Sequence, residues 1–142
     1  MKSALKLFAL LLIILSTSCK KEDAEGKRKL AALTKAGWNI LKIEDKAADG
    51  SWRDITGYRS PIEADDLRIF LANGYYEENE GPLKLPGSPQ VSYSGQWTFT
   101  DKATKIQIIN AQLMEIVELT DTKLVVTVNK TSTVERVTFG HP

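Results

Sequence analysis

The sequence has very little of the chemistry that enzymes and metal sites use. Its 142 residues include one cysteine and one histidine, so neither an internal disulfide nor a cluster of thiolate metal ligands is expected. The histidine, His141, lies one residue from the C-terminus, where chain ends tend to fray. No Ser–His–Asp or Cys–His arrangement is predicted from these residues. We therefore expect a protein that is not an enzyme and that uses no metal or cofactor.

Charge of one sign and long apolar runs are also lacking. The chain has 19 basic and 18 acidic residues, and such a near-neutral, mixed composition gives no electrostatic footprint for nucleic acid. The longest apolar run, residues 7–15, is well short of the about 20 residues that a membrane-spanning helix needs. The sequence therefore predicts neither nucleic-acid binding nor a domain that crosses a bilayer.

The N-terminal residues have the layout of an export signal. Two lysines precede the apolar run, and small residues follow it directly before Cys19, an order typical of cleaved signals. This layout resembles a bacterial lipoprotein signal, although Ser16 stands where leucine is usual. The resemblance implies a signal peptide over residues 1–18 and palmitate-type lipidation of Cys19, because several acyl chains anchor a protein stably. The alternative is a plain secretory signal followed by an incidental free cysteine.

Residues 19–29 are expected to form a charged tether. Lys20, Lys21, Glu22 and Asp23 follow the cysteine, and a segment without an apolar pattern predicts a mobile linker. These charges resemble the surface-export tag of some Gram-negative lipoproteins, and a simple solvated tether is the alternative. A short helix is predicted over residues 28–36, with Gly37 as its stop signal. We thus expect a monomer in the cell envelope, held at the outer membrane by its lipid.

Residues 65–78 predict a β-hairpin. Asn73 and Gly74 separate two runs of strand-forming residues, and this pair favours a two-residue turn in which both positions have φ > 0. The first strand carries two alternating sets of side chains: Leu67, Ile69 and Leu71 on one face, and Asp66, Arg68 and Phe70 on the other. Because the side-chain period is two, only one of these faces can form the core.

The rest of the chain repeats this pattern of short strand and polar turn. Further strands are predicted over residues 38–44, 51–55, 92–100, 105–109, 113–119, 124–128 and 134–139. Eight or nine short strands joined by short turns are typical of a sandwich or a barrel, and sequential turns favour an antiparallel up-and-down β-barrel. Residues 81–90 hold three prolines and predict a long loop, which in compact domains is often functional.

Several short motifs together resemble the lipocalin-like domain of small Gram-negative lipoproteins. They are Gly37-Trp38, the residues 51–56 around Trp52, the Asp-Asp strand and turn of residues 65–76, Gly95-Gln96-Trp97, and the turn of residues 119–124. The resemblance covers residues 30–139, and we assign residues 30–142 to this domain. It implies an all-β barrel that encloses a ligand cavity. The cysteine pair of many members is absent here, which leaves the loops at residues 57–63 and 81–90 less tied down.

A barrel of this kind predicts a binding protein for a small apolar or amphipathic ligand. Trp52, Leu83, Leu85 and Tyr93 lie beside turns and loops, so we expect them at the mouth of the barrel. Small barrels either fill with side chains or enclose one ligand, so Trp97, for which core packing is favoured, is a further candidate.

Alternatives stay open for the function of the domain and for the role of its acidic segment. If the barrel is filled, the domain could be a protein-interaction or inhibitor module that acts through its surface loops. The acidic residues Glu77, Glu78 and Glu80 offer oxygen ligands for weak calcium binding, but a charged strand end that discourages edge pairing is the favoured explanation.

Overall fold

The computed structural model describes residues 24–142 as a helix followed by nine strands. The predicted signal peptide, Cys19 and the first part of the tether lie outside the described residues. The strands are β1 (Trp38–Lys46), β2 (Trp52–Asp54), β3 (Leu67–Phe70), β4 (Tyr75–Asn79), β5 (Val91–Thr100), β6 (Lys105–Ile108), β7 (Gln112–Leu119), β8 (Lys123–Asn129) and β9 (Val134–Gly140). Two short 3₁₀ turns, η1 (Thr56–Tyr58) and η2 (Pro61–Glu63), lie between β2 and β3.

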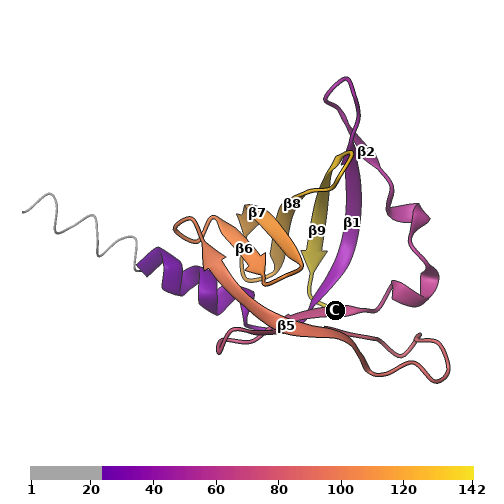
Figure 1. The fold of residues 1–142 in the computed structure, drawn as a ribbon, viewed down its shortest axis with the longest axis horizontal. Coiled ribbons are helices and arrows are strands. Elements are labelled where there is room, and N and C mark those ends of the chain that lie inside the picture. Colours follow the sequence, from indigo (N-terminus) through magenta and orange to yellow (C-terminus); the bar gives the residue numbers. More distant parts are fainter. Residues whose placement is uncertain (1–23) are drawn as a thin grey trace, which may run out of the picture.

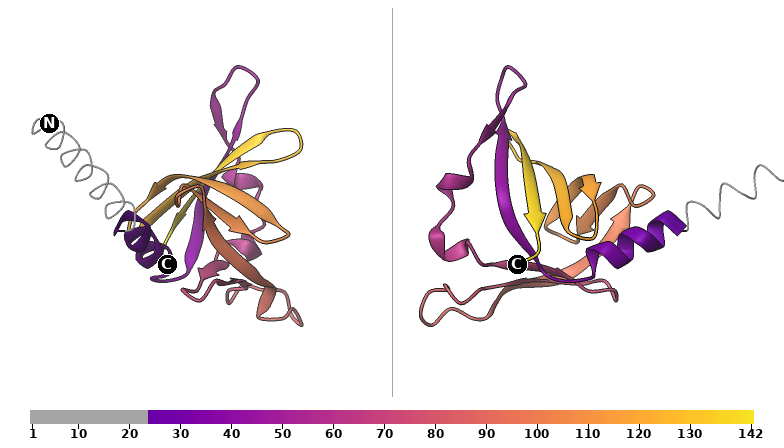
Figure 2. Two further views of the ribbon diagram at one scale, coloured as in Figure 1. Left: turned by 60° about the vertical axis from the view of Figure 1, so that its left-hand side comes forward. Right: turned by 180° about the vertical axis from the view of Figure 1, so that it is seen from behind.

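Eight of these strands close into an antiparallel barrel. From β3 to β9 each strand pairs with the next, and β1 completes the ring because it pairs with both β3 and β9. The remaining strand, β2, pairs only with the end of β1 and projects beyond the ring as a hairpin (Figure 1; Figure 2). The predicted all-β, up-and-down barrel of about eight strands is therefore confirmed.

One stretch of the barrel wall is built by a loop instead of a strand. On one edge of β1, β3 pairs with the first two residues and β2 with the last three. Between them, the Thr56 hydroxyl accepts a hydrogen bond from the Ile43 amide at 2.8 Å, and the Arg59 guanidinium donates to the Ile40 carbonyl at 3.2 Å. Figure 1 shows η1 and η2 on the side of β1 that faces away from β9. The loop thus covers a gap that no β-ladder closes.

The N-terminal helix closes one end of the barrel. Leu33 and Trp38 are completely buried, and the indole Nε1 of Trp38 donates to the Leu33 carbonyl at 2.8 Å. Lys29 donates from Nζ to the Ala103 carbonyl in the β5–β6 turn at 3.0 Å. The helix extends from the barrel on the side opposite η1 and η2 (Figure 1). We call this end, with its turns between β3 and β4, β5 and β6, and β7 and β8, the closed end.

The helix begins earlier and ends earlier than predicted. Residues 24–33 are helical, whereas the predicted helix was residues 28–36, so the helix begins within the segment that we assigned to the tether. Glu25 pairs with Arg28 at 2.8 Å and with Lys29 at 3.9 Å. Ion pairs three and four residues apart stabilise a helix. They can do so in a segment that has no periodic apolar residues, and such periodicity was the signal used for the prediction. No helix within residues 24–142 is long and apolar enough to cross a membrane.

The predicted hairpin is present, but its turn is of a different type. Gly74 has φ of +84°, whereas Asn73 does not have positive φ. The Gly74 amide donates to the Leu71 carbonyl at 2.9 Å, and the Leu71 amide donates to the Tyr75 carbonyl at 2.8 Å. These bonds define a four-residue turn from Leu71 to Gly74 that ends on the left-handed glycine. The loop between Leu71 and Tyr75 therefore has three residues, a common hairpin length. Asn73 contributes differently, because its side-chain oxygen accepts from the Tyr75 amide at 3.0 Å.

Candidate functional site

A cavity opens at the end of the barrel opposite the helix, which we call the open end. Its volume is about 270 Å³. Its apolar lining comes from six strands: Ile40 and Ile43 on β1, Phe70 on β3, Tyr76 on β4, Met114 on β7, Leu124, Val126 and Val128 on β8, and Val137 and Phe139 on β9. Its polar lining consists of Arg59, Glu63, Arg68, Glu78, Gln112, Lys130 and Glu135. The cavity therefore has an apolar interior and charged groups around it.

The register of β3 and β4 places charge beside aromatic rings on the inner face. Arg68 lies opposite Glu78 and Phe70 lies opposite Tyr76, and directly opposite residues share a face of the sheet. The rings of Phe70 and Tyr76 are 4.9 Å apart, and Phe70 makes an edge contact with Trp97 at 5.4 Å. The aromatic pair lies toward the closed end, and the charged pair lies one step nearer the mouth.

The charged pair and Tyr76 form a small hydrogen-bonded cluster in the wall. Nε of Arg68 is 3.3 Å from Oε1 of Glu78, and the Tyr76 hydroxyl donates to the same oxygen at 2.8 Å. Burial raises the pKa of Tyr76 well above its usual range, and the neighbouring negative charge of Glu78 raises it further. The phenol is therefore a constant hydrogen-bond donor, and Glu78 is held between a cation and a hydroxyl.

The other charges of the lining come from the segment with η1 and η2 and from the β8–β9 hairpin. Arg59 donates to the Ile40 carbonyl and to the Glu63 carbonyl, so its guanidinium bonds to neutral oxygens. Lys130 is 3.8 Å from Glu135 across the β8–β9 turn. The lining thus holds equal numbers of cationic and anionic side chains, and the mouth has no strong charge of one sign.

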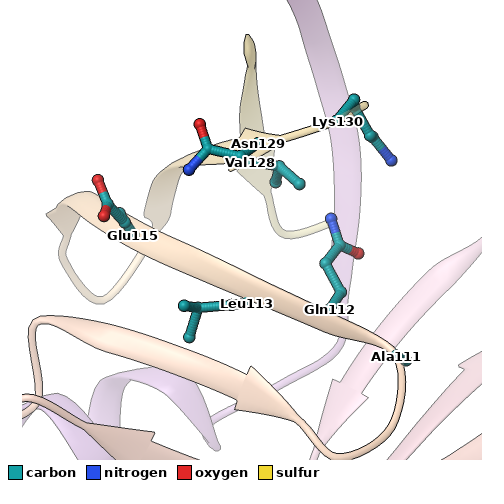
Figure 3. Close-up of a pocket in the computed structure, with 7 residues that line it drawn as sticks. All are labelled: Ala111, Gln112, Leu113, Glu115, Val128, Asn129 and Lys130. Carbon is teal, nitrogen blue, oxygen red and sulfur yellow. The ribbon is translucent and has the colours of Figure 1, made fainter. Parts of the chain in front are cut away.

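A second hollow adjoins the mouth where β7 and β8 separate. Their pairing stops at Met114 and Val128, and beyond this point Gln112 and Lys130 lie apart around a hollow of about 370 Å³ (Figure 3). Gln112, Val128 and Lys130 line both hollows. The two hollows therefore adjoin one another at these three residues.

Two of the predicted ligand-binding residues lie close to the cavity without being part of its lining. Tyr93 is on the inner face of β5, 6.0 Å from the Tyr76 ring, and it is partly exposed. Gly95 leaves room for it, because a Cβ at that position would lie 3.1 Å from the Tyr93 hydroxyl. Trp97 is buried behind Phe70 and donates from Nε1 to the Leu71 carbonyl at 3.0 Å. Trp97 thus supports the cavity wall from the core.

The other three candidates lie away from the cavity. Trp52 is on β2, outside the ring, where the guanidinium of Arg136 lies 4.4 Å from its ring centre. Leu83 and Leu85 are exposed in the loop between β4 and β5. The Leu83 amide donates to Oδ2 of Asp65 at 3.0 Å, so the loop is held against the start of β3. None of these three residues lines the cavity, so a ligand-binding role for them stays a prediction.

The polar residues that line the cavity were not identified from the sequence. Arg68 shares one face of the first hairpin strand with Asp66 and Phe70. This face has only one large apolar residue, so it appeared to be the more polar of the two faces of the strand. Glu78 stood in an acidic segment that we interpreted as a charged strand end. The cross-strand register that joins Arg68 to Glu78 was the usable signal. It follows from a hairpin turn whose residue count the sequence did not specify.

The single histidine packs into the fold at the closed end. His141, which we expected to fray, lies against Trp38 with ring centres 4.2 Å apart. Its Nδ1 is 2.9 Å from the Gly37 carbonyl oxygen, and its Nε2 is 2.9 Å from that of Asp121. The histidine thus fastens the chain end to the closed end. Within residues 24–142 no group of three or more histidine, cysteine or acidic side chains could hold a metal ion.

The chain was also compared with known proteins. No model of a known protein family matches the chain, and no curated protein matches it either. The barrel and its cavity are therefore the observations on which a function can be argued.

Proposed function

We propose that the protein binds a small apolar or amphipathic ligand in the cavity of its barrel. The observation that carries this proposal is the cavity of about 270 Å³ with an apolar interior and a few polar groups. Ligand sites have this composition, and they commonly enclose about 300–1,000 Å³, so the cavity suits a small ligand. An interior that is hollow at the open end supports this function over the alternative of a filled barrel acting through its loops.

The test is to fill the cavity and measure what the protein carries. Val128 is buried, lines both hollows and lies near the mouth, so Val128→Phe should occupy the space that a ligand needs. The full chain is purified from its native host without added ligand, and native mass spectrometry measures its mass. We expect a non-covalent extra mass of a few hundred daltons on the unaltered chain, which disappears when the chain is denatured, and we expect it to be absent from Val128→Phe.

The matched control is Val117→Phe, because Val117 is on the neighbouring strand β7 with its side chain exposed. This variant should keep the extra mass. If the unaltered chain carried no non-covalent mass, even after incubation with lipid extract, the proposal would be contradicted and the surface loops would be favoured as the functional region.

We further propose that the barrel is anchored as a lipoprotein of the outer membrane through Cys19. The support is the signal-like layout of residues 1–19. The five residues from Cys19 to the start of the helix at residue 24 can span at most about 18 Å. Because the helix leaves the barrel at the closed end (Figure 2), an anchored protein would have its open end turned away from the bilayer. Cys19→Ala should abolish incorporation of labelled palmitate and release the protein from membranes; retention of the label would contradict the anchor.

A further inference from the structure

Arg68 lies in an unusual position for a permanent cation. It is in the middle of β3, opposite Trp38 of β1 on one side and Glu78 of β4 on the other. Its side chain is 20% exposed and lines the cavity together with apolar residues. A guanidinium cannot lose its proton in a protein, so its charge must be satisfied by hydrogen bonds and counter-charges.

The structure satisfies this charge only in part. Nε of Arg68 approaches Oε1 of Glu78 at 3.3 Å. Within residues 24–142, the ion pair with Glu78 is the one contact of the Arg68 guanidinium to an acceptor. Its two terminal amino groups are not buried atoms that lack a partner, so solvent in the cavity reaches them. A guanidinium offers five N–H donors in a planar fork that fits a carboxylate with two parallel hydrogen bonds. The unused edge of this fork is therefore a site for an acceptor that comes with the ligand.

We propose that the ligand is a single-chain amphiphile whose carboxylate head binds the terminal amino groups of Arg68. This assignment rests on the proposed ligand-binding function and specifies the class of ligand. The chain of the amphiphile lies in the apolar interior against residues such as Phe70, Val126 and Phe139. The head then stays near the mouth, at the level of Arg68 and Glu78.

Glu78 and Tyr76 act as positioning residues for this cation. The Tyr76 hydroxyl fixes Oε1 of Glu78 at 2.8 Å, and this oxygen in turn orients the Nε edge of Arg68. The fork is thereby held with its other edge available. Glu78 also repels a second carboxylate, so it limits the affinity for an anionic head. Removing its charge should therefore strengthen binding, whereas removing the charge of Arg68 should weaken it.

The experiment compares three ligands that share one chain and differ in the head. Decanoate, decan-1-ol and decyltrimethylammonium are titrated into the full chain in lipid nanodiscs by isothermal calorimetry, with empty nanodiscs as the blank. We expect decanoate to bind tightest. Hydrogen bonds to a charged group have a net strength that corresponds to roughly tenfold to hundredfold in affinity, so Arg68→Gln should weaken decanoate by this factor and leave decan-1-ol unchanged.

Three variants control the interpretation. Arg53→Gln removes an exposed guanidinium that pairs with Asp45 outside the ring, and it should leave all three affinities unchanged. Glu78→Gln should tighten decanoate and weaken the ammonium ligand. Arg68→Lys keeps the charge but loses the planar fork, so its decanoate affinity should lie between those of the unaltered chain and Arg68→Gln. Circular dichroism melting shows whether each variant is folded.

The outcomes separate this inference from the proposed function. Equal binding of decanoate and decan-1-ol, with no effect of Arg68→Gln, would overturn the carboxylate assignment and leave the cavity as a ligand site. Tightest binding of the ammonium ligand would overturn the assigned sign of charge. Binding of none of the three, together with a clean native mass, would overturn the proposed function itself.

Discussion

The two ends of the barrel are built from the same strands, yet they differ in almost every physical property. At the closed end, Leu33 and Trp38 have no exposed surface, and the helix and the chain end at His141 add a layer of packing. At the open end, the interior is hollow and Arg68 and Glu78 lie inside the wall. The barrel therefore concentrates its stability at one end, which allows the other end to stay incompletely filled.

The cause of the difference is how each end is covered. The turns of the closed end are short, and the helix packs directly on them, as the contact of Lys29 with Ala103 shows. In the wall between the two ends, β1 lacks a strand partner between its pairings with β3 and β2, and the segment with η1 and η2 covers the gap. This loop bonds to the β1 backbone at Ile43 and Ile40 and brings only two side chains, Arg59 and Glu63, to the cavity lining. Coverage by loops thus leaves the cavity.

The largest expected effect comes from a matched pair of leucine substitutions, one at each end. Leu33→Ala should reduce the free energy of unfolding by about 2–5 kcal/mol, because it leaves a cavity in a fully buried site. Leu113→Ala at the open end should change it by no more than about 0.5 kcal/mol, since Leu113 is 44% exposed. Urea unfolding followed by tryptophan fluorescence measures both values. Equal losses for the two variants would break the comparison between the ends.

A smaller effect is expected from acid, and it should act first near the open end. Hydrogen bonds from Arg136 and then from Lys42 lower the pKa of Glu44 from 4.5 to about 2. Glu44 and Arg136 join β1 to β9 across the outer wall, with their closest atoms 2.7 Å apart. Because the folded state favours the ionised carboxylate, this stabilisation is complete above about pH 4.5 and is lost as the pH falls toward 2.

The size of the acid effect is set by the exposure of the partners. Lys42 and Arg136 are partly solvated, so screening reduces the contribution to about 1–2 kcal/mol. Glu44→Gln should flatten the dependence of stability on pH between 4.5 and 2. Amide hydrogen exchange at low pH should show faster opening of the β1–β9 ladder than of the residues around Trp38. Uniform opening along the barrel would contradict a separate, charge-dependent open end.

The fold could be predicted from the sequence because local signals and global architecture agree. Alternating apolar residues and polar turns specified every strand, and Asn73-Gly74 specified the hairpin between β3 and β4. The errors arose where two local solutions have similar energies. Asn-Gly suits both a two-residue and a three-residue hairpin loop, and ion pairs such as Glu25–Arg28 extend a helix without an apolar pattern.

The site could not be predicted in the same way, because it depends on contacts between strands. We placed aromatic and apolar residues beside loops at the mouth, but Trp52 lies outside the ring and stacks against Arg136. The lining instead includes Arg68 and Glu78, which face each other only through the register of β3 and β4. A cavity is space that side chains fail to fill, and no single position in the sequence encodes it.

The smallest expected effect tests the boundary between the two ends, at Tyr76. This residue has its ring in the aromatic cluster and its hydroxyl on Glu78, so Tyr76→Phe removes one hydrogen bond and little packing. Because the Glu78 side chain is 33% exposed and water can replace the lost hydroxyl, the free energy of unfolding should fall by only about 0.5–1 kcal/mol. The neighbouring Tyr75, partly exposed and on the opposite face of β4, is the control, and Tyr75→Phe should leave the free energy of unfolding unchanged.

Decanoate binding should weaken in Tyr76→Phe alone, because Glu78 then holds Arg68 less firmly. If both variants lost the same stability and neither changed decanoate binding, Tyr76 would belong entirely to the closed end, and the polar cluster would be part of the packing.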